Sequence, residues 1–66
     1  MEVLVNGQPQ AVAEGATVAQ LLAERGMTAR HVAVEVNLQL VPRDAHAERI
    51  LQAGDRLEVV TLVGGG

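Results

Sequence analysis

The sequence predicts an α+β fold in which a mixed sheet of about five strands packs on one helix. Short runs with the two-residue period of strands occur near the start, in the middle and at the end of the 66-residue chain. Residues 17–26 instead carry a helix start signal, a helical apolar stripe and a glycine stop signal. A chain of this length forms a single small domain, because it has no room for a second core.

The chain opens with a predicted β-hairpin. Val3 and Val5 alternate with their neighbours up to Asn6-Gly7, the strongest short hairpin signal, because both turn positions need a positive φ. The return strand is predicted over residues 10–13. Pro9 stands at its start, where a missing amide donor is tolerated.

A short helix is predicted over residues 18–25. Thr17 precedes it, and a glutamine three residues later completes a capping box. Gly26 follows as a natural C′ residue. The helix carries one apolar stripe with the spacing i, i+3 and i+4, made of Val18, Leu21 and Leu22.

The two-residue period returns after the helix. Residues 32–36 read V-A-V-E-V, so the three valines face one way in a predicted strand. Asn37 breaks this strand, and a short strand over residues 38–41 ends at Pro42.

The remaining segment leads to the last strand. Residues 43–49 are polar and alanine-rich, which is consistent with a helical turn or a loop. Ile50 and Leu51 are predicted to enter the core together. A turn over residues 52–55, with Asp55 as a turn residue, precedes the last strand at 56–62.

The simplest arrangement places the first and last strands side by side and parallel, because both are apolar runs typical of central strands. The helix then covers one face of the sheet. This is the β-grasp arrangement. It predicts a domain over residues 1–62 and a flexible glycine tail, residues 63–66, that projects from a central strand.

Composition excludes several classes of protein. The chain has a formal net charge of −3 and no aromatic residue or lysine, which argues against a nucleic-acid binder. Mild acidity fits docking onto a basic protein surface, and it equally fits ordinary solubility. The absence of cysteine and of a signal-peptide pattern, together with short apolar stretches, predicts a soluble, cytoplasmic protein.

No catalytic or metal site is predicted. His31 and His46 have no companion ligands at metal-binding spacing. The sequence has neither a Ser-His-Asp set nor a glycine loop that leads into a helix to hold phosphate.

The glycine end is the most informative feature of the chain. Gly64, Gly65 and Gly66 are three of its seven glycines, and glycine presents the slimmest possible backbone. Such an end fits a channel that rejects side chains and leaves the Gly66 carboxylate as the reactive group. The alternative is a frayed terminus or a linker.

The motifs taken together resemble those of the ThiS family of sulfur carrier proteins, across essentially the whole chain. The residues that carry the resemblance are the Asn6-Gly7 hairpin, the helix, V-A-V-E-V-N at 32–37, V-P-R at 41–43, G-D-R-L-E-V-V at 54–60 and the terminal Gly-Gly. Family members often carry an aromatic residue shortly after V-P-R, where this chain has Ala45-His46. The third terminal glycine is a second departure.

The resemblance implies a ubiquitin-like fold and a carrier that is not an enzyme. An adenylating activating enzyme, ThiF-like, uses ATP to convert the Gly66 carboxylate into an acyl-adenylate. A persulfide from a sulfurtransferase or cysteine desulfurase then yields a Gly66 thiocarboxylate. A thiazole synthase, ThiG-like, receives the sulfur for thiamine biosynthesis. No cofactor is expected on the carrier itself.

The same hypothesis needs a docking surface, because ordering glycines costs on the order of 1–2 kcal/mol per residue. Gly64 and Gly65 are expected to thread into the partners. The predicted docking residues are Val60, Leu62 and Val63 as apolar contacts, with Arg43 and Arg56 as polar edges. Val60 has ordinary core packing as its alternative.

Other functions stay open at the level of sequence. Carriers for molybdopterin, tRNA thiolation or cysteine synthesis share the terminal chemistry, as does a ubiquitin-like modifier. A β-grasp interaction module without terminal chemistry is the alternative from a different class.

Overall fold

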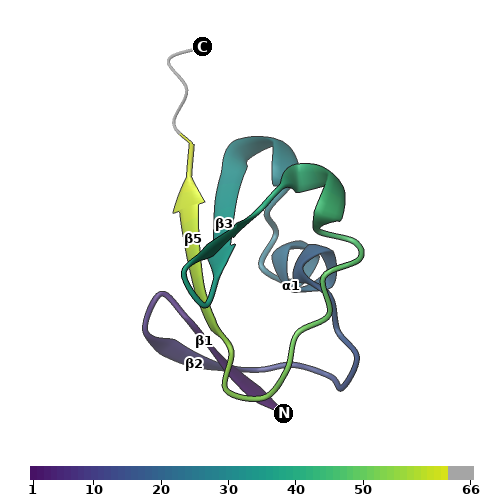
Figure 1. The fold of residues 1–66 in the computed structure, drawn as a ribbon, viewed down its shortest axis with the longest axis vertical. Coiled ribbons are helices and arrows are strands. Elements are labelled where there is room, and N and C mark those ends of the chain that lie inside the picture. Colours follow the sequence, from purple (N-terminus) through teal and green to yellow (C-terminus); the bar gives the residue numbers. More distant parts are fainter. Residues whose placement is uncertain (63–66) are drawn as a thin grey trace.

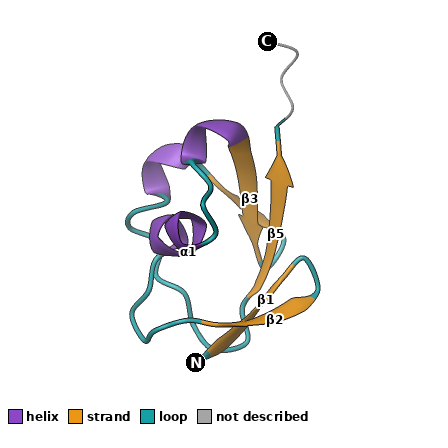
Figure 2. Ribbon diagram, turned by 180° about the vertical axis from the view of Figure 1, so that it is seen from behind, coloured by secondary structure: helices purple, strands orange, loops and turns teal. Residues whose placement is uncertain are grey.

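A computed structural model describes residues 1–62, and within them five strands form one mixed sheet. The strand order is β2-β1-β5-β3-β4, and helix α1 lies against one face of this sheet (Figures 1 and 2). The elements are β1 (Glu2–Val5), β2 (Gln8–Ala11), α1 (Val18–Glu24), the 3₁₀ helix η1 (Ala29–His31), β3 (Val32–Val36), β4 (Gln39–Val41), the 3₁₀ helix η2 (Arg43–Ala45) and β5 (Arg56–Thr61). The predicted β-grasp fold is confirmed.

Strands β1 and β5 run parallel, as predicted, with Leu4 opposite Arg56 and Val5 opposite Leu57. Strands β3 and β5 are antiparallel, so the sheet is mixed. Strand β5 lies at the centre of the order, between β1 and β3.

The first hairpin turns where the sequence indicates. Asn6 and Gly7 have φ values of 52° and 82°, the positive pair that a two-residue turn requires. The return strand begins at Gln8, earlier than predicted, so Pro9 lies inside it, opposite Leu4. This position is tolerated because β2 is an edge strand.

Helix α1 begins at the predicted capping box. The Thr17 hydroxyl accepts a hydrogen bond from the Gln20 amide at 3.2 Å, and the Gln20 side-chain oxygen accepts one from the Thr17 amide at 2.9 Å. The helix ends one residue earlier than predicted, with Arg25 as C-cap. Gly26 follows with a φ of 72°.

The core lies between α1 and the covered face of the sheet. It contains only aliphatic side chains, because the sequence supplies no aromatic ones. Its members are Val3, Val5, Val12, Ala16, Val18, Leu21, Leu22, Val32, Val34, Val36, Val41, Leu51, Leu57 and Val59.

The prediction that Ile50 and Leu51 both enter the core is wrong for Ile50. Leu51 is 2% exposed, whereas Ile50 is 53% exposed. The backbone here is extended: Ile50 forms an isolated antiparallel bridge with Thr17, and the Leu51 amide donates to the Ala16 carbonyl at 2.8 Å. Consecutive side chains of extended backbone point to opposite sides, so only one of the two enters the core.

Asp55 is more than the predicted turn residue, because its carboxylate is buried and joins two loops. It accepts a hydrogen bond from the Gln52 amide at 2.8 Å and one from the Asn37 side-chain amide at 3.0 Å. Asn37 in turn accepts from the Arg56 amide at 3.0 Å. These contacts fix the start of β5 against the turn between β3 and β4.

Candidate functional site

The candidate site is the sheet face opposite α1. Along β5, Leu57 and Val59 point into the core, whereas Arg56, Glu58 and Val60 are exposed. This alternation is the two-residue period of a strand that is buried on one face only. One face of β5 therefore stabilises the fold, and the other is available to a partner.

The predicted apolar docking residues that the structure describes lie on or next to this face. Val60 is 56% exposed, which rules out core packing as the reason for its presence. It pairs with the half-buried Ala33 of β3. Leu62, directly after β5, is 50% exposed. Val60 and Leu62 thus place exposed apolar side chains at the C-terminal end of β5.

Sequence reasoning missed a further apolar side chain on this face. Leu40 of β4 is 66% exposed and pairs with Glu35, which pairs with Glu58 of β5. Paired residues share a face, so Leu40 belongs to the open face. The signal was present in the sequence, because Leu40 precedes the inward-facing Val41 in a short strand.

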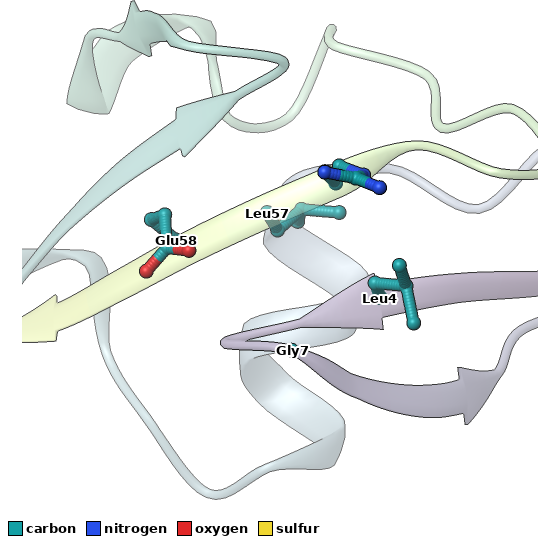
Figure 3. Close-up of a pocket in the computed structure, with 5 residues that line it drawn as sticks. Leu4, Gly7, Leu57 and Glu58 are labelled. Atoms are coloured by element: carbon teal, nitrogen blue, oxygen red, sulfur yellow. The ribbon is translucent and has the colours of Figure 1, made fainter.

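Two shallow hollows flank the start of β5. One is lined by Leu4, Gly7, Arg56, Leu57 and Glu58, where the first hairpin meets β5 (Figure 3). The other is lined by Asn37, Leu38, Arg56 and Glu58. Arg56 lines both hollows, so the structure places this predicted docking residue on the open face, at the end opposite Leu62.

Arg43 is not brought together with the other predicted docking residues. It is exposed in η2, after β4, and β3 separates β4 from β5 in the sheet. Val63, Gly64, Gly65 and Gly66 lie outside the described residues.

The two histidines have local roles. The buried His46 has its Nε2 at 3.0 Å from the Val41 carbonyl, and the His31 Nδ1 lies 3.2 Å from the Thr28 hydroxyl. In residues 1–62, no three His, Cys, Asp or Glu side chains group as ligands for a metal ion. Neither α1 nor the 3₁₀ helices of this part of the chain have the length and hydropathy that a bilayer crossing requires.

Comparison with known proteins identifies the family. Residues 3–66 match the model of the ThiS family. The chain is 35% identical to the sulfur carrier protein ThiS of Escherichia coli, with both proteins covered completely. It is also 41% identical to one part of a thiazole synthase from Paramagnetospirillum magneticum, and it spans 20% of that protein's length.

A solved structure gives the same result. The ThiS protein of Geobacter metallireducens, described as a thiamine biosynthesis protein, superimposes with a TM-score of 0.84 at 35% identity, and both chains are covered completely. Sequence and fold therefore indicate the same family. This chain belongs to the ThiS family.

Proposed function

We propose that this chain is a sulfur carrier of thiamine biosynthesis, which bears the transferred sulfur on the Gly66 carboxyl group. The observation that carries the proposal is the full-length match to a sulfur carrier protein, which extends to the glycine end at residue 66. The open sheet face supports it, because a carrier must be recognised by several proteins in turn.

The chemistry follows from the carboxylate. A carboxylate resists nucleophiles until one oxygen is turned into a good leaving group. An adenylating enzyme related to ubiquitin-activating enzymes would provide this by forming the acyl-adenylate from ATP, with release of pyrophosphate. A persulfide sulfur then forms the carbon–sulfur bond as AMP departs, and a thiol cleaves the sulfur–sulfur bond to free the thiocarboxylate.

The carrier itself contributes binding and position. A thiocarboxylate is anionic and nucleophilic without a nearby base, so neither histidine is needed for the transfer. ATP belongs to the activating enzyme, and the carrier holds no cofactor of its own in this proposal. A cytoplasmic location is part of the same proposal.

A thiazole synthase is the proposed sulfur acceptor. Two proteins named thiazole synthase, from Paramagnetospirillum magneticum and Magnetococcus marinus, each carry a segment similar to this entire chain within one fifth of their length. This supports a functional link between a carrier of this type and a thiazole synthase. A sulfurtransferase or cysteine desulfurase completes the proposed set of partners.

The proposal is tested by intact mass spectrometry after incubation with ATP, the host's activating enzyme and a sulfide source. We expect a mass gain that matches replacement of one oxygen by sulfur, located at Gly66. A variant with one additional alanine after Gly66 should show no gain. Equal gains in both proteins, or none in the native protein with an active enzyme, would contradict the proposal.

The docking face is tested with a matched pair of substitutions. Val60→Asp and Ile50→Asp each add one negative charge at a side chain that is about half exposed, 56% and 53% respectively. Only Val60 lies on the open face. We expect Val60→Asp to weaken binding to the activating enzyme at least about fivefold, as for a buried interface residue, and Ile50→Asp to leave it unchanged. If the two substitutions change binding to the activating enzyme equally, the open face is not part of the docking surface.

A further inference from the structure

Strand β5 has different neighbours on its two flanks. Strand β3 accompanies it from Leu57 to Thr61. On the other flank, β1 pairs with it only as far as Leu57, where the first hairpin turns away. Figure 1 shows the later part of β5 with β3 on one side and no strand on the other.

The side chain of Asn6 replaces the missing strand for one residue. Its amide nitrogen donates to the Val59 carbonyl at 3.1 Å, and its amide oxygen accepts from the Val59 N–H at 2.8 Å. A primary amide carries the same donor and acceptor pair as a backbone residue. Asn6 therefore completes the hydrogen bonds of Val59 on the flank that β1 has left.

Thr61 is the next residue whose backbone groups point to that flank. In an antiparallel ladder, the residues that bond to the partner strand alternate. Arg56 and Leu62 bond towards β3: the Arg56 carbonyl accepts from Asn37 at 2.8 Å, and the Leu62 amide donates to His31 at 2.7 Å. The backbone N–H and C=O groups of the even-numbered residues of β5 thus point towards β3. Those of the odd-numbered residues point to the other flank, towards β1 or Asn6.

By this alternation, the N–H and C=O of Thr61 point away from β3, beyond the reach of β1 and Asn6. Neither group has a hydrogen-bond partner among residues 1–62. Unpaired groups at a strand edge are a template for pairing with another chain. This edge lies one residue before Leu62, which precedes the terminal segment that the proposed function makes reactive.

We propose that an extended segment of the activating enzyme adds to the sheet at Thr61, in line with β1. The inference rests on the proposed function and specifies how the partner binds. The added segment would exchange two hydrogen bonds with Thr61 and lie beside the exposed Val60 and Leu62. Strand addition of this kind takes affinity from backbone bonds and specificity from neighbouring side chains.

The occupant is a partner segment rather than a second copy of this chain. One residue offers two hydrogen bonds, which is too little edge to hold two copies together. A segment that belongs to a larger enzyme surface also gains the open-face contacts. Pairing at Thr61 would fix the direction in which the chain leaves the sheet towards Gly66.

The experiment removes one backbone donor without changing a side chain. A chain of 66 residues is accessible to chemical synthesis, so the Thr61 N–H can be replaced by an ester oxygen. The matched control is the same replacement at Ala11, whose amide faces outward from the edge strand β2, two strands away from β5, since Val12 bonds to Met1 and alternation turns Ala11 away. In both variants the ester also makes the carbonyl of the preceding residue a weaker hydrogen-bond acceptor. In both variants this carbonyl lies in a ladder of the sheet, so the side effect is matched.

Calorimetric binding to the host's activating enzyme is compared for the three proteins. We expect the Thr61 ester to bind about fivefold more weakly than the Ala11 ester, which corresponds to one hydrogen bond. Equal affinities for the two esters would overturn the inference. If the unmodified protein fails to bind and supports no ATP–pyrophosphate exchange, the proposed function itself fails.

Amide hydrogen exchange on the unmodified protein gives a second measurement that needs no variant. The Thr61 amide should exchange rapidly in the free protein, because it has no acceptor in residues 1–62. It should become protected in the saturated complex. Leu62, already bonded to His31, serves as the internal reference. A Thr61 amide that stays unprotected in the complex would overturn the inference.

Discussion

Replacing Asn6 with glycine should destabilise the fold more than the substitution of an exposed turn residue usually does. The substitution removes the two hydrogen bonds to the backbone of Val59, at 2.8 and 3.1 Å. Glycine keeps the turn, because the φ of 52° at this position is accessible to it without strain. The loss of stability therefore measures the side-chain hydrogen bonds and not a change in turn geometry.

The magnitude follows from the burial of Val59. Each hydrogen bond contributes about 1 kcal/mol net, and a buried group left unpaired costs about 1–3 kcal/mol. Val59 is only 6% exposed, so water reaches its backbone poorly. We expect Asn6→Gly to cost about 2–3 kcal/mol, and Asn6→Ala about 1 kcal/mol more because alanine disfavours a positive φ.

The assay is urea unfolding followed by far-ultraviolet circular dichroism, since the chain has no aromatic residue to serve as a fluorescent probe. A loss of about 2–3 kcal/mol also corresponds to a fall in Tm of roughly 8–24 °C for a domain of this size. An Asn6→Gly variant within about 0.5 kcal/mol of the native protein would refute the reasoning, because the two bonds would then contribute less than an average one.

Three further predictions concern residues of the described part. Leu38 has a φ of 70° with a side chain that is 89% exposed, so Leu38→Gly should stabilise the fold by about 1 kcal/mol in the same urea assay; a loss of stability would show that its side chain packs in solution. Leu51→Ala should cost about 2–5 kcal/mol and Ile50→Ala less than about 1 kcal/mol; equal losses would contradict the opposite orientation of these neighbours. Thr17→Ala should cost about 1 kcal/mol through loss of the capping box, and a neutral result would mean that the neighbouring loop alone fixes the start of α1.

The fold could be predicted because local signals agree with the tertiary arrangement. Asn6-Gly7 forms the predicted turn, Thr17 caps the predicted helix, and the valines of β3 face the core. Each of these patterns acts over a few neighbouring residues, which is the range over which sequence periodicity is informative.

The errors and omissions arise where contacts distant in sequence decide the outcome. Ile50 faces outward because its backbone bridges to Thr17, 33 residues earlier, and periodicity around position 50 does not reveal that bridge. The link from Asn6 to Val59 joins residues 53 apart. Of the predicted docking residues, Arg56 and Val60 lie on the exposed side of β5, because strand alternation places them there, and the exposed Leu62 directly follows the strand. Arg43 was predicted as a polar edge together with Arg56, but it lies in η2 after β4, and β3 separates β4 from β5.

Strand β5 contributes both to stability and to the proposed function. Its inward residues, Leu57 and Val59, belong to the core, and its flank towards β3 is paired throughout. The side chains of its outward residues are exposed, and the Thr61 edge has no partner within residues 1–62, so substitutions of these side chains should not unfold the domain. Substitutions at Val60 should therefore separate binding from stability, whereas substitutions at Val59 should not. In the proposed function the reactive end follows β5, the central strand of the sheet, so a partner that binds this strand at Thr61 would position the segment that follows.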